Sequence, residues 1–216
     1  MDESEIFSSL KTMIDQNLHA NVIRDNIREL SPEILEKLNA IPRENIRKFV
    51  SECSKNFNLG KVVADIGCGY RTNREELLDK YTGNIRYIGI DYIDRFKNNY
   101  ENNNIEFILG DAMDIPLLDN TISTVISTEC LEHIYDDKKA LSEMSRILQP
   151  DGILILTVPG RDIPNHEKLP YQFDYRRYTI DNLENLLLNN KFKDIEIDEI
   201  FYMGFSVNIM CTAKLK

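Results

Sequence analysis

The stretch VVADIGCGYRTN, residues 62–73, decides the fold. An apolar run ends in an acid, and Gly67 and Gly69 follow with one residue between them. This pattern is typical of a buried strand that turns sharply, because glycine lets the backbone pass where a side chain would block it. A dinucleotide-binding loop would carry a third glycine, whereas this chain has Arg71 and Thr72 there. The stretch therefore predicts a ligand loop that is not built for a pyrophosphate.

The alternation of short apolar segments with helical stretches continues along the chain. Five buried strands are expected, at residues 61–66, 85–91, 105–111, 122–128 and 152–158. Helices are expected between them at 74–81 and 136–148. Apolar strands separated by helices indicate a parallel sheet that is covered on both faces.

The end of the chain follows a different pattern. After a helix expected at 179–190, residues 194–201 and 205–215 predict two strands that are joined by a short turn at Met203–Gly204. The predicted fold class is α/β: a Rossmann-like, seven-stranded, mostly parallel sheet with a C-terminal antiparallel hairpin and an N-terminal helical extension.

Residues 1–58 are expected to form that helical extension, and residues 59–216 the domain that holds the sheet. Apolar residues recur at helical spacing from residue 5 to 57, Ser31 is placed as an N-cap before Pro32, and Pro42 is expected to separate two helices. The extension could act as a lid over an acceptor pocket, or cover a sheet face or an oligomer contact. The pattern does not separate these roles, and it leaves the oligomeric state open.

Composition limits the classes of function. The net charge of −10 repels phosphate backbones, so a nucleic-acid partner is not expected. The cysteines at 53, 68, 130 and 211 form no CxxC pair, which argues against a metal site and indicates free thiols in a reducing compartment. No apolar run has the length of a membrane span, and the acidic N-terminus lacks the layout of a signal peptide. A cytoplasmic protein without membrane insertion is expected.

Acidic residues follow successive strands of the predicted sheet. Asp91 lies 24 residues beyond Gly67, where a carboxylate can accept both hydroxyls of a ribose, and Asp111 could accept from an adenine amino group. A nucleoside without phosphates does not need the third glycine. S-adenosylmethionine is such a ligand, and its sulfonium suits an acidic site. The loop is therefore expected to hold a nucleoside.

Several motifs carry a resemblance to one family. They are DIGCGY, YIGIDY, GDAMDIPLLDNTISTVIST, LEHIYD, EMSRILQPDGILILTVP and RRYTIDNLENLLLNNKF, in this order. From about Lys61 onward the chain resembles the class I S-adenosylmethionine-dependent methyltransferases, in particular the small-molecule branch with the ubiquinone and menaquinone biosynthesis enzymes. The later H…P…DYRRYT segment is similar to relatives associated with surface-polysaccharide synthesis. The resemblance implies S-adenosyl-L-methionine as cofactor and methyl transfer to a small-molecule or glycan-type acceptor, at oxygen.

The resemblance also implies which residues hold that cofactor. They are Asp65, Gly67, Cys68 and Gly69 for the methionine part, Asp91 and Tyr92 for the ribose and adenine, Asp111 and Ala112 for the adenine edge, and Thr128 and Glu129 beside the sulfonium. Arg71 departs from the pattern, because most relatives have the third glycine there.

A hydroxyl acceptor would be helped by a general base, for which histidine is the usual side chain near neutral pH. His133 lies shortly before a helix and His166 follows the fifth strand, so both are candidate catalytic residues. The structural alternatives are hydrogen bonding within the turn for His133 and a solvated loop position for His166. His19 is expected at the surface.

Aromatic and basic residues gather at 160–178 in a chain that is otherwise acidic. They are Tyr171, Phe173, Tyr175 and Tyr178, with Arg161, Arg176 and Arg177. They could form a substrate wall with arginines for a phosphate or carboxylate, or an ordered loop that covers the core. Two other functions stay open: a non-catalytic S-adenosylmethionine-binding partner subunit, and an NAD-dependent oxidoreductase. The missing glycine and the final hairpin count against the oxidoreductase.

Overall fold

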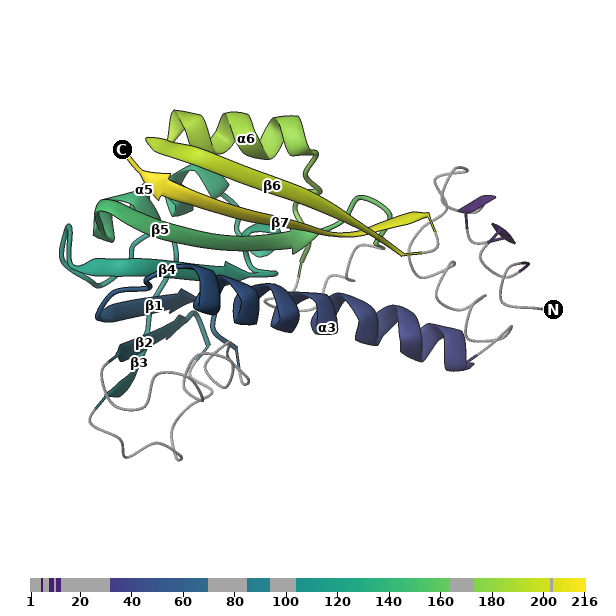
Figure 1. Cartoon of the computed structure of the whole chain (residues 1–216), viewed down its shortest axis with the longest axis horizontal. Helices are drawn as coiled ribbons and strands as arrows, with labels where there is room; N and C mark the ends of the chain where they lie inside the picture. The colour runs from purple at the N-terminus through teal and green to yellow at the C-terminus, as the bar shows by residue number, and fades with distance from the viewer. Residues whose placement is uncertain are drawn as a thin grey trace.

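A computed structural model describes residues 5, 8, 9, 11, 12, 32–69, 85–93, 104–163, 173–202 and 204–216 of the chain. Within these residues the strands form a seven-stranded sheet in the order β3-β2-β1-β4-β5-β7-β6 (Figure 1). The strands are β1 (Val62–Ile66), β2 (Arg86–Asp91), β3 (Ile105–Leu109), β4 (Ile122–Thr128), β5 (Leu148–Pro159), β6 (Phe192–Tyr202) and β7 (Phe205–Leu215).

The direction of the strands confirms the predicted fold class. Strands β1 to β5 pair in parallel, whereas β7 runs antiparallel to both β5 and β6. The hairpin turns beside Gly204, which has a φ of +87° that an L side chain rarely adopts. Because β7, the second strand of the hairpin, pairs with both β5 and β6, it lies inside the sheet and β6 forms the edge.

Helices lie on both faces of the sheet. They are α3 (Pro32–Asn56), α5 (Asp137–Ile147) and α6 (Ile180–Asn189), with a 3-10 turn, η1, at Leu131–His133. Side chains at the N-caps start two of them: the Asp136 carboxylate accepts from the Lys139 N–H, and the Thr179 hydroxyl accepts from the Asn182 N–H. None of the described helices has the length and hydropathy that a membrane span requires. The helix expected at 74–81 lies outside the described residues.

The prediction that Pro42 separates two helices is wrong. Helix α3 runs without a break from Pro32 to Asn56 with Pro42 inside it. A proline there removes one backbone hydrogen bond. The helix continues because Ile46, Val50 and Cys53, which share one face, are buried against the sheet.

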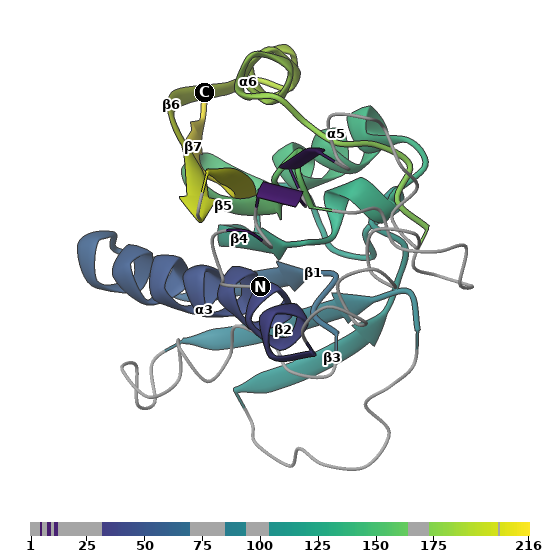
Figure 2. The ribbon, with the colours of Figure 1, turned by 90° about the vertical axis from the view of Figure 1, so that its right-hand side faces the viewer.

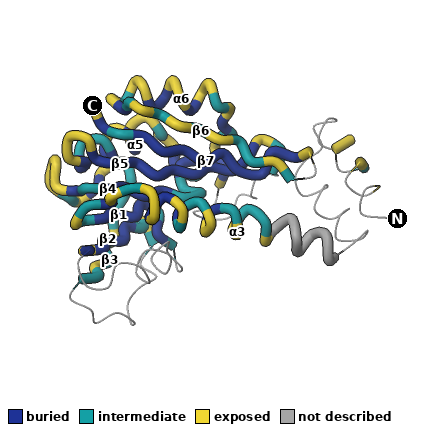
Figure 3. The backbone as a smooth tube through the Cα atoms, viewed as in Figure 1, coloured by how far each residue is buried: buried dark blue, intermediate teal, exposed yellow. Residues whose placement is uncertain are grey.

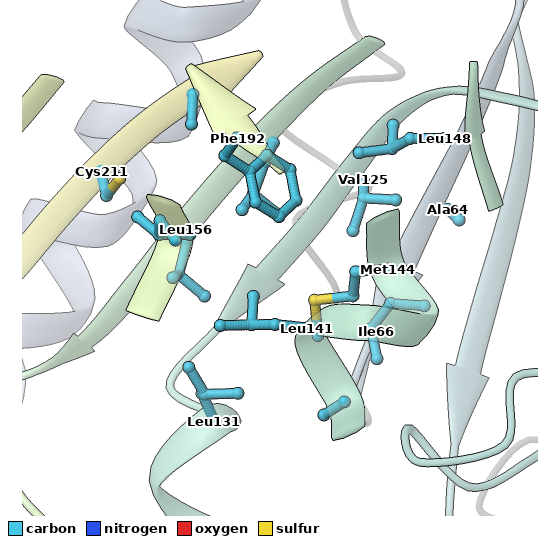
Figure 4. Close-up of a cluster of buried hydrophobic side chains, with 14 of the residues drawn as sticks. Ala64, Ile66, Val125, Leu131, Leu141, Met144, Leu148, Leu156, Phe192 and Cys211 are labelled. Atoms are coloured by element: carbon cyan, nitrogen blue, oxygen red, sulfur yellow. The ribbon is translucent and has the colours of Figure 1, made fainter. Parts of the chain in front are cut away.

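Strand residues alternate between two apolar layers. Val63 and Ile155 face α3, while Ala64 and Leu156 belong to the layer under α5 and α6. Figures 1 and 2 show α3 on one side of the sheet and the other two helices opposite. The second layer is the larger, and Figure 4 shows side chains of β1, β4, β5, α5 and β7 meeting in it. The central strands are accordingly buried along most of their length (Figure 3).

Two strands begin earlier than their apolar pattern predicts. Strand β5 starts at Leu148, which pairs with Ile122 before a register shift, and β6 starts at Phe192 before a shift near Glu196. Asp151 and Asp194 have positive φ beside these irregularities. Polar residues follow the buried Leu148 and Phe192 and interrupt the apolar pattern, and this is why the pattern did not show the first residues of these strands.

The four cysteines are free thiols, as expected. Cys53, Cys68 and Cys211 are buried, and Cys130 is half-buried.

Candidate functional site

A cavity of about 530 Å³ opens where four parallel strands end. Gly67 follows β1, Asp91 ends β2, Asp111 follows β3 and Glu129 follows β4, and all four line this cavity. Ligands of open parallel sheets bind outside these carboxyl ends. Seven residues of the predicted site are brought together here: Gly67, Asp91, Tyr92, Asp111, Ala112, Glu129 and His133.

The glycine turn closes one end of the cavity with backbone alone. Gly67 has a φ of +75°, and a Cβ at this position would lie 2.2 Å from the Cys130 sulfur. Gly69 also has a positive φ, of +57°, but no atom of the described residues lies within 4 Å of where its Cβ would be. The first glycine is therefore required by close packing, and the second has no described neighbour at that position.

The carboxylate of Asp91 ties this turn to the end of β2. Its Oδ2 accepts from the Gly69 N–H at 2.9 Å, and its Oδ1 accepts from the Ile93 N–H at 3.0 Å. Asp111 is held in the same way, because its Oδ1 accepts from the Met113 N–H at 2.8 Å. Each carboxylate oxygen can accept a further hydrogen bond, so both groups can hold their loops and also bind a ligand.

The other predicted residues lie around the cavity without lining it. Asp65 is fully buried in β1, where its Oδ2 accepts from the Tyr87 hydroxyl at 2.6 Å. Cys68 is buried beneath the turn, and Gly69 and Thr128 are likewise not among the lining residues. His166 and Arg71 lie outside the described residues.

Glu129 occupies a strained position at the end of β4. Its φ of +47° is unusual for a residue with a side chain, and such strain is concentrated at functional sites. Its Oε1 accepts from the Thr157 hydroxyl at 3.0 Å, and the Asn208 amide is 3.5 Å away. Asn208 in turn accepts from Asn45 of α3 at 3.3 Å. The carboxyl at the cavity is thus connected to the N-terminal helix.

His133 is paired with a carboxylate from a distant part of the chain. Its Nδ1 lies 2.9 Å from Oδ1 of Asp174, whose Oδ2 accepts from Arg177 at 2.7 Å. Burial alone would lower the pKa of the His133 imidazole, but the Asp174 hydrogen bond and the charge of Glu132 outweigh it and raise the pKa above 6.5. Donation from Nδ1 leaves Nε2 as the basic nitrogen. The arrangement suits proton transfer.

Glu132 adds a second buried carboxyl, and its Oε1 lies 3.5 Å from Nε2 of His133. Burial is the main cause that raises the pKa of both Glu129 and Glu132, and the charge of Glu132 adds to the effect on Glu129. Among the described residues, no group of three or more His, Cys, Asp or Glu side chains could hold a metal ion.

Sequence reasoning did not identify Glu132, Asp174, Thr157 or Asn208 as parts of the site. In the DYRRYT segment the arginines and aromatic rings were identified as candidate site residues, but Asp174 was not. No local signal places residue 174 beside residue 133, because only the folded chain joins them.

The arginines of the 160–178 segment mostly serve the structure. Arg176 donates to the carbonyls of Ile134 and Tyr135 at 2.6 Å each, and Arg177 donates to Asp174 and to the Ile163 carbonyl. These hydrogen bonds agree with the alternative that Arg176 and Arg177 belong to an ordered loop. Tyr178 is buried with its hydroxyl on Asp137, and Tyr171 lies outside the described residues. Phe173 and Tyr175, however, line the cavity with Tyr135.

Comparisons with known proteins give a consistent picture. Residues 64–156 match the family described as "Methyltransferase domain". The O-methyltransferase cnsE of Penicillium expansum is 26% identical over 152 residues, which cover 65% of this chain and 55% of that protein. The fatty-acid O-methyltransferase of Mycolicibacterium smegmatis is 28% identical over 141 residues, which cover 62% of this chain and 51% of that protein. This chain thus spans about half the length of these curated relatives.

A solved structure is similar in fold. It is the 1,6-didemethyltoxoflavin-N1-methyltransferase of Burkholderia thailandensis, with a TM-score of 0.63 and 16% identity over 79% of this chain and 78% of that one. The matched segment 64–156 holds the strand-end residues and His133, whereas α3, Asp174 and the final hairpin lie outside it.

Proposed function

We propose that the chain is a class I S-adenosylmethionine-dependent methyltransferase, because its residues 64–156 match the family described as "Methyltransferase domain", and that it methylates an oxygen atom of a small molecule. The observation that carries the proposal is one cavity that joins the glycine turn, two strand-end carboxylates and a histidine paired with Asp174. The predicted division into an N-terminal helical extension at 1–58 and a methyltransferase domain at 59–216 is part of the proposal.

The residues at the cavity fit S-adenosyl-L-methionine, the cofactor of this family. Asp91 would accept from the ribose hydroxyls and Asp111 from the adenine amino group, because each has acceptor capacity beyond its backbone bond. No described atom fills the position of a Cβ at Gly69, so a ligand could lie against the backbone there. Glu129 would lie on the side of the sulfonium, whose positive charge favours the ionised carboxyl. Asp65 and Cys68 are buried next to the glycine turn and do not line the cavity.

When bound, the cofactor supplies a methyl group on a positively charged sulfur, and the carbon–sulfur bond breaks with its electron pair left on sulfur. The protein's task is to align the acceptor and remove its proton. His133 would accept the hydroxyl proton at Nε2, the nitrogen that also lies 3.5 Å from Oε1 of Glu132, so Glu132 would share in holding that proton. Asp174 fixes the tautomer and stabilises the imidazolium that results. His166 remains a second candidate for this role.

Two observations support oxygen as the atom that is methylated. A hydroxyl acceptor needs a base, for which His133 is the candidate, and O-methyltransferases are among the relatives. Within this proposal, the sequence resemblance suggests phenolic hydroxyls of the quinone branch and glycan hydroxyls of the polysaccharide-associated branch as the acceptors to test first.

The test is calorimetric titration of the purified chain with S-adenosylmethionine, S-adenosylhomocysteine and NAD. We expect the first two to bind and NAD not to bind. Asp91→Ala should lose about 1–3 kcal/mol of binding free energy, because a hydrogen bond to a charged group is removed. Asp198→Ala, which removes an equal charge from an exposed position on β6, is the matched control and should bind normally. Binding of NAD in place of the sulfonium compounds would contradict the proposal.

A further inference from the structure

Three aromatic side chains form one wall of the cavity. Tyr135, Phe173 and Tyr175, here called the aromatic wall, all line it. The rings of Tyr135 and Tyr175 meet edge to face with centroids 5.8 Å apart, and those of Phe173 and Tyr175 do so at 4.8 Å. Such contacts fix ring orientation. The wall therefore presents a defined apolar surface to a ligand.

The wall is held in place by polar bonds behind it. Tyr175 and Phe173 come from the segment before α6, and Tyr135 from the turn after η1. The Tyr175 N–H donates to the Glu132 carbonyl at 2.9 Å, and Arg176 donates to two carbonyls of the opposite segment. The two segments are thus cross-linked, so the wall is preorganised before any ligand binds.

The rings nevertheless remain open to solvent. Tyr135 is 71% exposed, Tyr175 45% and Phe173 36%. The core does not need these rings as cover, because each keeps a large part of its surface in water. Three adjacent exposed rings at a cavity are typical of a binding surface.

The charges around the cavity are of one sign. Asp91 and Asp111 line it, Glu129 adds a carboxyl whose pKa burial raises, and the described lining residues include no lysine or arginine. Among the described residues, Arg176 and Arg177 of the adjoining segment are committed to backbone carbonyls and Asp174. A phosphate or carboxylate on the acceptor would meet repulsion from the carboxylates and no uncommitted cation among the described residues.

We propose, resting on the proposed function, that the acceptor is an uncharged or positively charged aromatic alcohol, whose ring lies against the aromatic wall with its hydroxyl at His133. His133 lines the same cavity as the aromatic wall, and the Phe173 carbonyl lies 3.4 Å from its Nδ1, so wall and imidazole are neighbours. A sugar ring would need several hydrogen-bonding partners, whereas the described residues on this side are His133, Ile134, Cys130 and the three rings. A sugar that is linked to a nucleoside diphosphate is disfavoured further, because its phosphates are negatively charged.

The test uses four probes of known charge, titrated by calorimetry into protein saturated with S-adenosylhomocysteine. They are 4-ethylphenol (neutral), tyramine (cationic), 4-hydroxyphenylacetate (anionic) and UDP-glucose. We expect 4-ethylphenol and tyramine to bind about tenfold or more tightly than the other two. Tyr175→Leu should weaken both by about 2- to 10-fold and leave S-adenosylhomocysteine affinity unchanged. Phe201→Leu, which changes an exposed ring on β6, is the control variant.

The outcomes separate the two proposals. If S-adenosylhomocysteine does not bind to the unmodified chain, the proposed function fails. If it binds but the anion or UDP-glucose binds more tightly than the neutral phenol, only the acceptor class is wrong. Unchanged affinity for the neutral phenol in both Tyr175→Leu and Tyr135→Leu would also overturn the proposed acceptor class.

Discussion

Asp174 is the residue that controls the charge of His133. Its carboxylate lies 2.9 Å from Nδ1 and is the largest of the groups that raise the pKa of the imidazole, ahead of Glu132 and the Phe173 carbonyl. Burial acts in the opposite direction. A base must be unprotonated to act, so the proposed methyl transfer should accelerate as pH rises through the pKa of His133.

Asp174→Asn should therefore lower the pKa of His133, because the neutral amide removes the favourable charge while burial remains. NMR titration of the imidazole protons measures this without an acceptor, and His133→Gln identifies the signal among the three histidines. The acid limb of any pH–rate profile should move to lower pH in parallel. Asp198→Asn is the charge-matched control, and an unchanged or higher pKa in Asp174→Asn would contradict the assignment.

Two glycines in the same turn should respond differently to alanine. Gly67→Ala should cost about 3 kcal/mol or more of the free energy of unfolding, because positive φ strain adds to collision with Cys130. Gly69→Ala meets open space and should cost only the strain, about 1–2 kcal/mol. Urea unfolding of both variants measures the difference. Equal costs would mean that the contact with Cys130 does not constrain the turn.

At the scale of elements, helix α5 is joined to the segment after β3 by one ion-pair network. Arg146 donates to Glu143, to Asp119 and to the carbonyls of Ile115 and Leu117. Glu143 also accepts from the Ile115 N–H. These bonds, led by those from Arg146, lower the pKa of Glu143 to about 2. The network fixes a segment that carries residues of the cavity.

Glu143→Gln should cost about 2–3 kcal/mol of unfolding free energy at pH 7, because it leaves the Arg146 charge without its main partner. A depressed pKa contributes stability above the unfolded value of 4.5, and this is lost as pH falls toward about 2. The difference between variant and parent should therefore shrink below pH 4.5. Urea titrations from pH 2 to 7 test this, with the exposed Glu184→Gln as control. A difference that stays constant with pH would exclude the ionic contribution.

At the scale of the whole molecule, both apolar layers contain a thiol that only unfolding should expose. Cys53 of α3 lies in the layer on one face, and Cys211 of β7 lies in the layer on the other. Burial raises the pKa of each thiol to about 12, so little thiolate forms near neutral pH.

Thiol labelling of the native protein at pH 8 should be slow at both cysteines, and its rate should follow global unfolding as urea increases. Mass spectrometry of the labelled peptides separates the two positions. If α3 were only loosely attached, Cys53 would react well before Cys211. Equal protection would mean that the helix and the sheet unfold as one unit.

The sequence by itself determined the sheet, its closing hairpin and the residues at its strand ends. These follow from local periodicity, since alternation of apolar and polar residues and the position of glycines are readable within a few residues. Gly67, Asp91, Asp111 and Glu129 each lie at the end of a parallel strand. Because parallel strands end at one edge of a sheet, these four residues are expected around one cavity.

Which groups meet across that edge, and what charge they carry, depends on the folding of the whole chain. The pairing of His133 with Asp174, the bonds of Arg176 behind the aromatic wall and the link from Asn45 to Glu129 join positions far apart in sequence. The unbroken path of α3 through Pro42 was likewise decided by burial of Ile46 and Val50 on the sheet. The physical reason is the same in each case: desolvation and contact depend on neighbours in space, which local patterns do not specify.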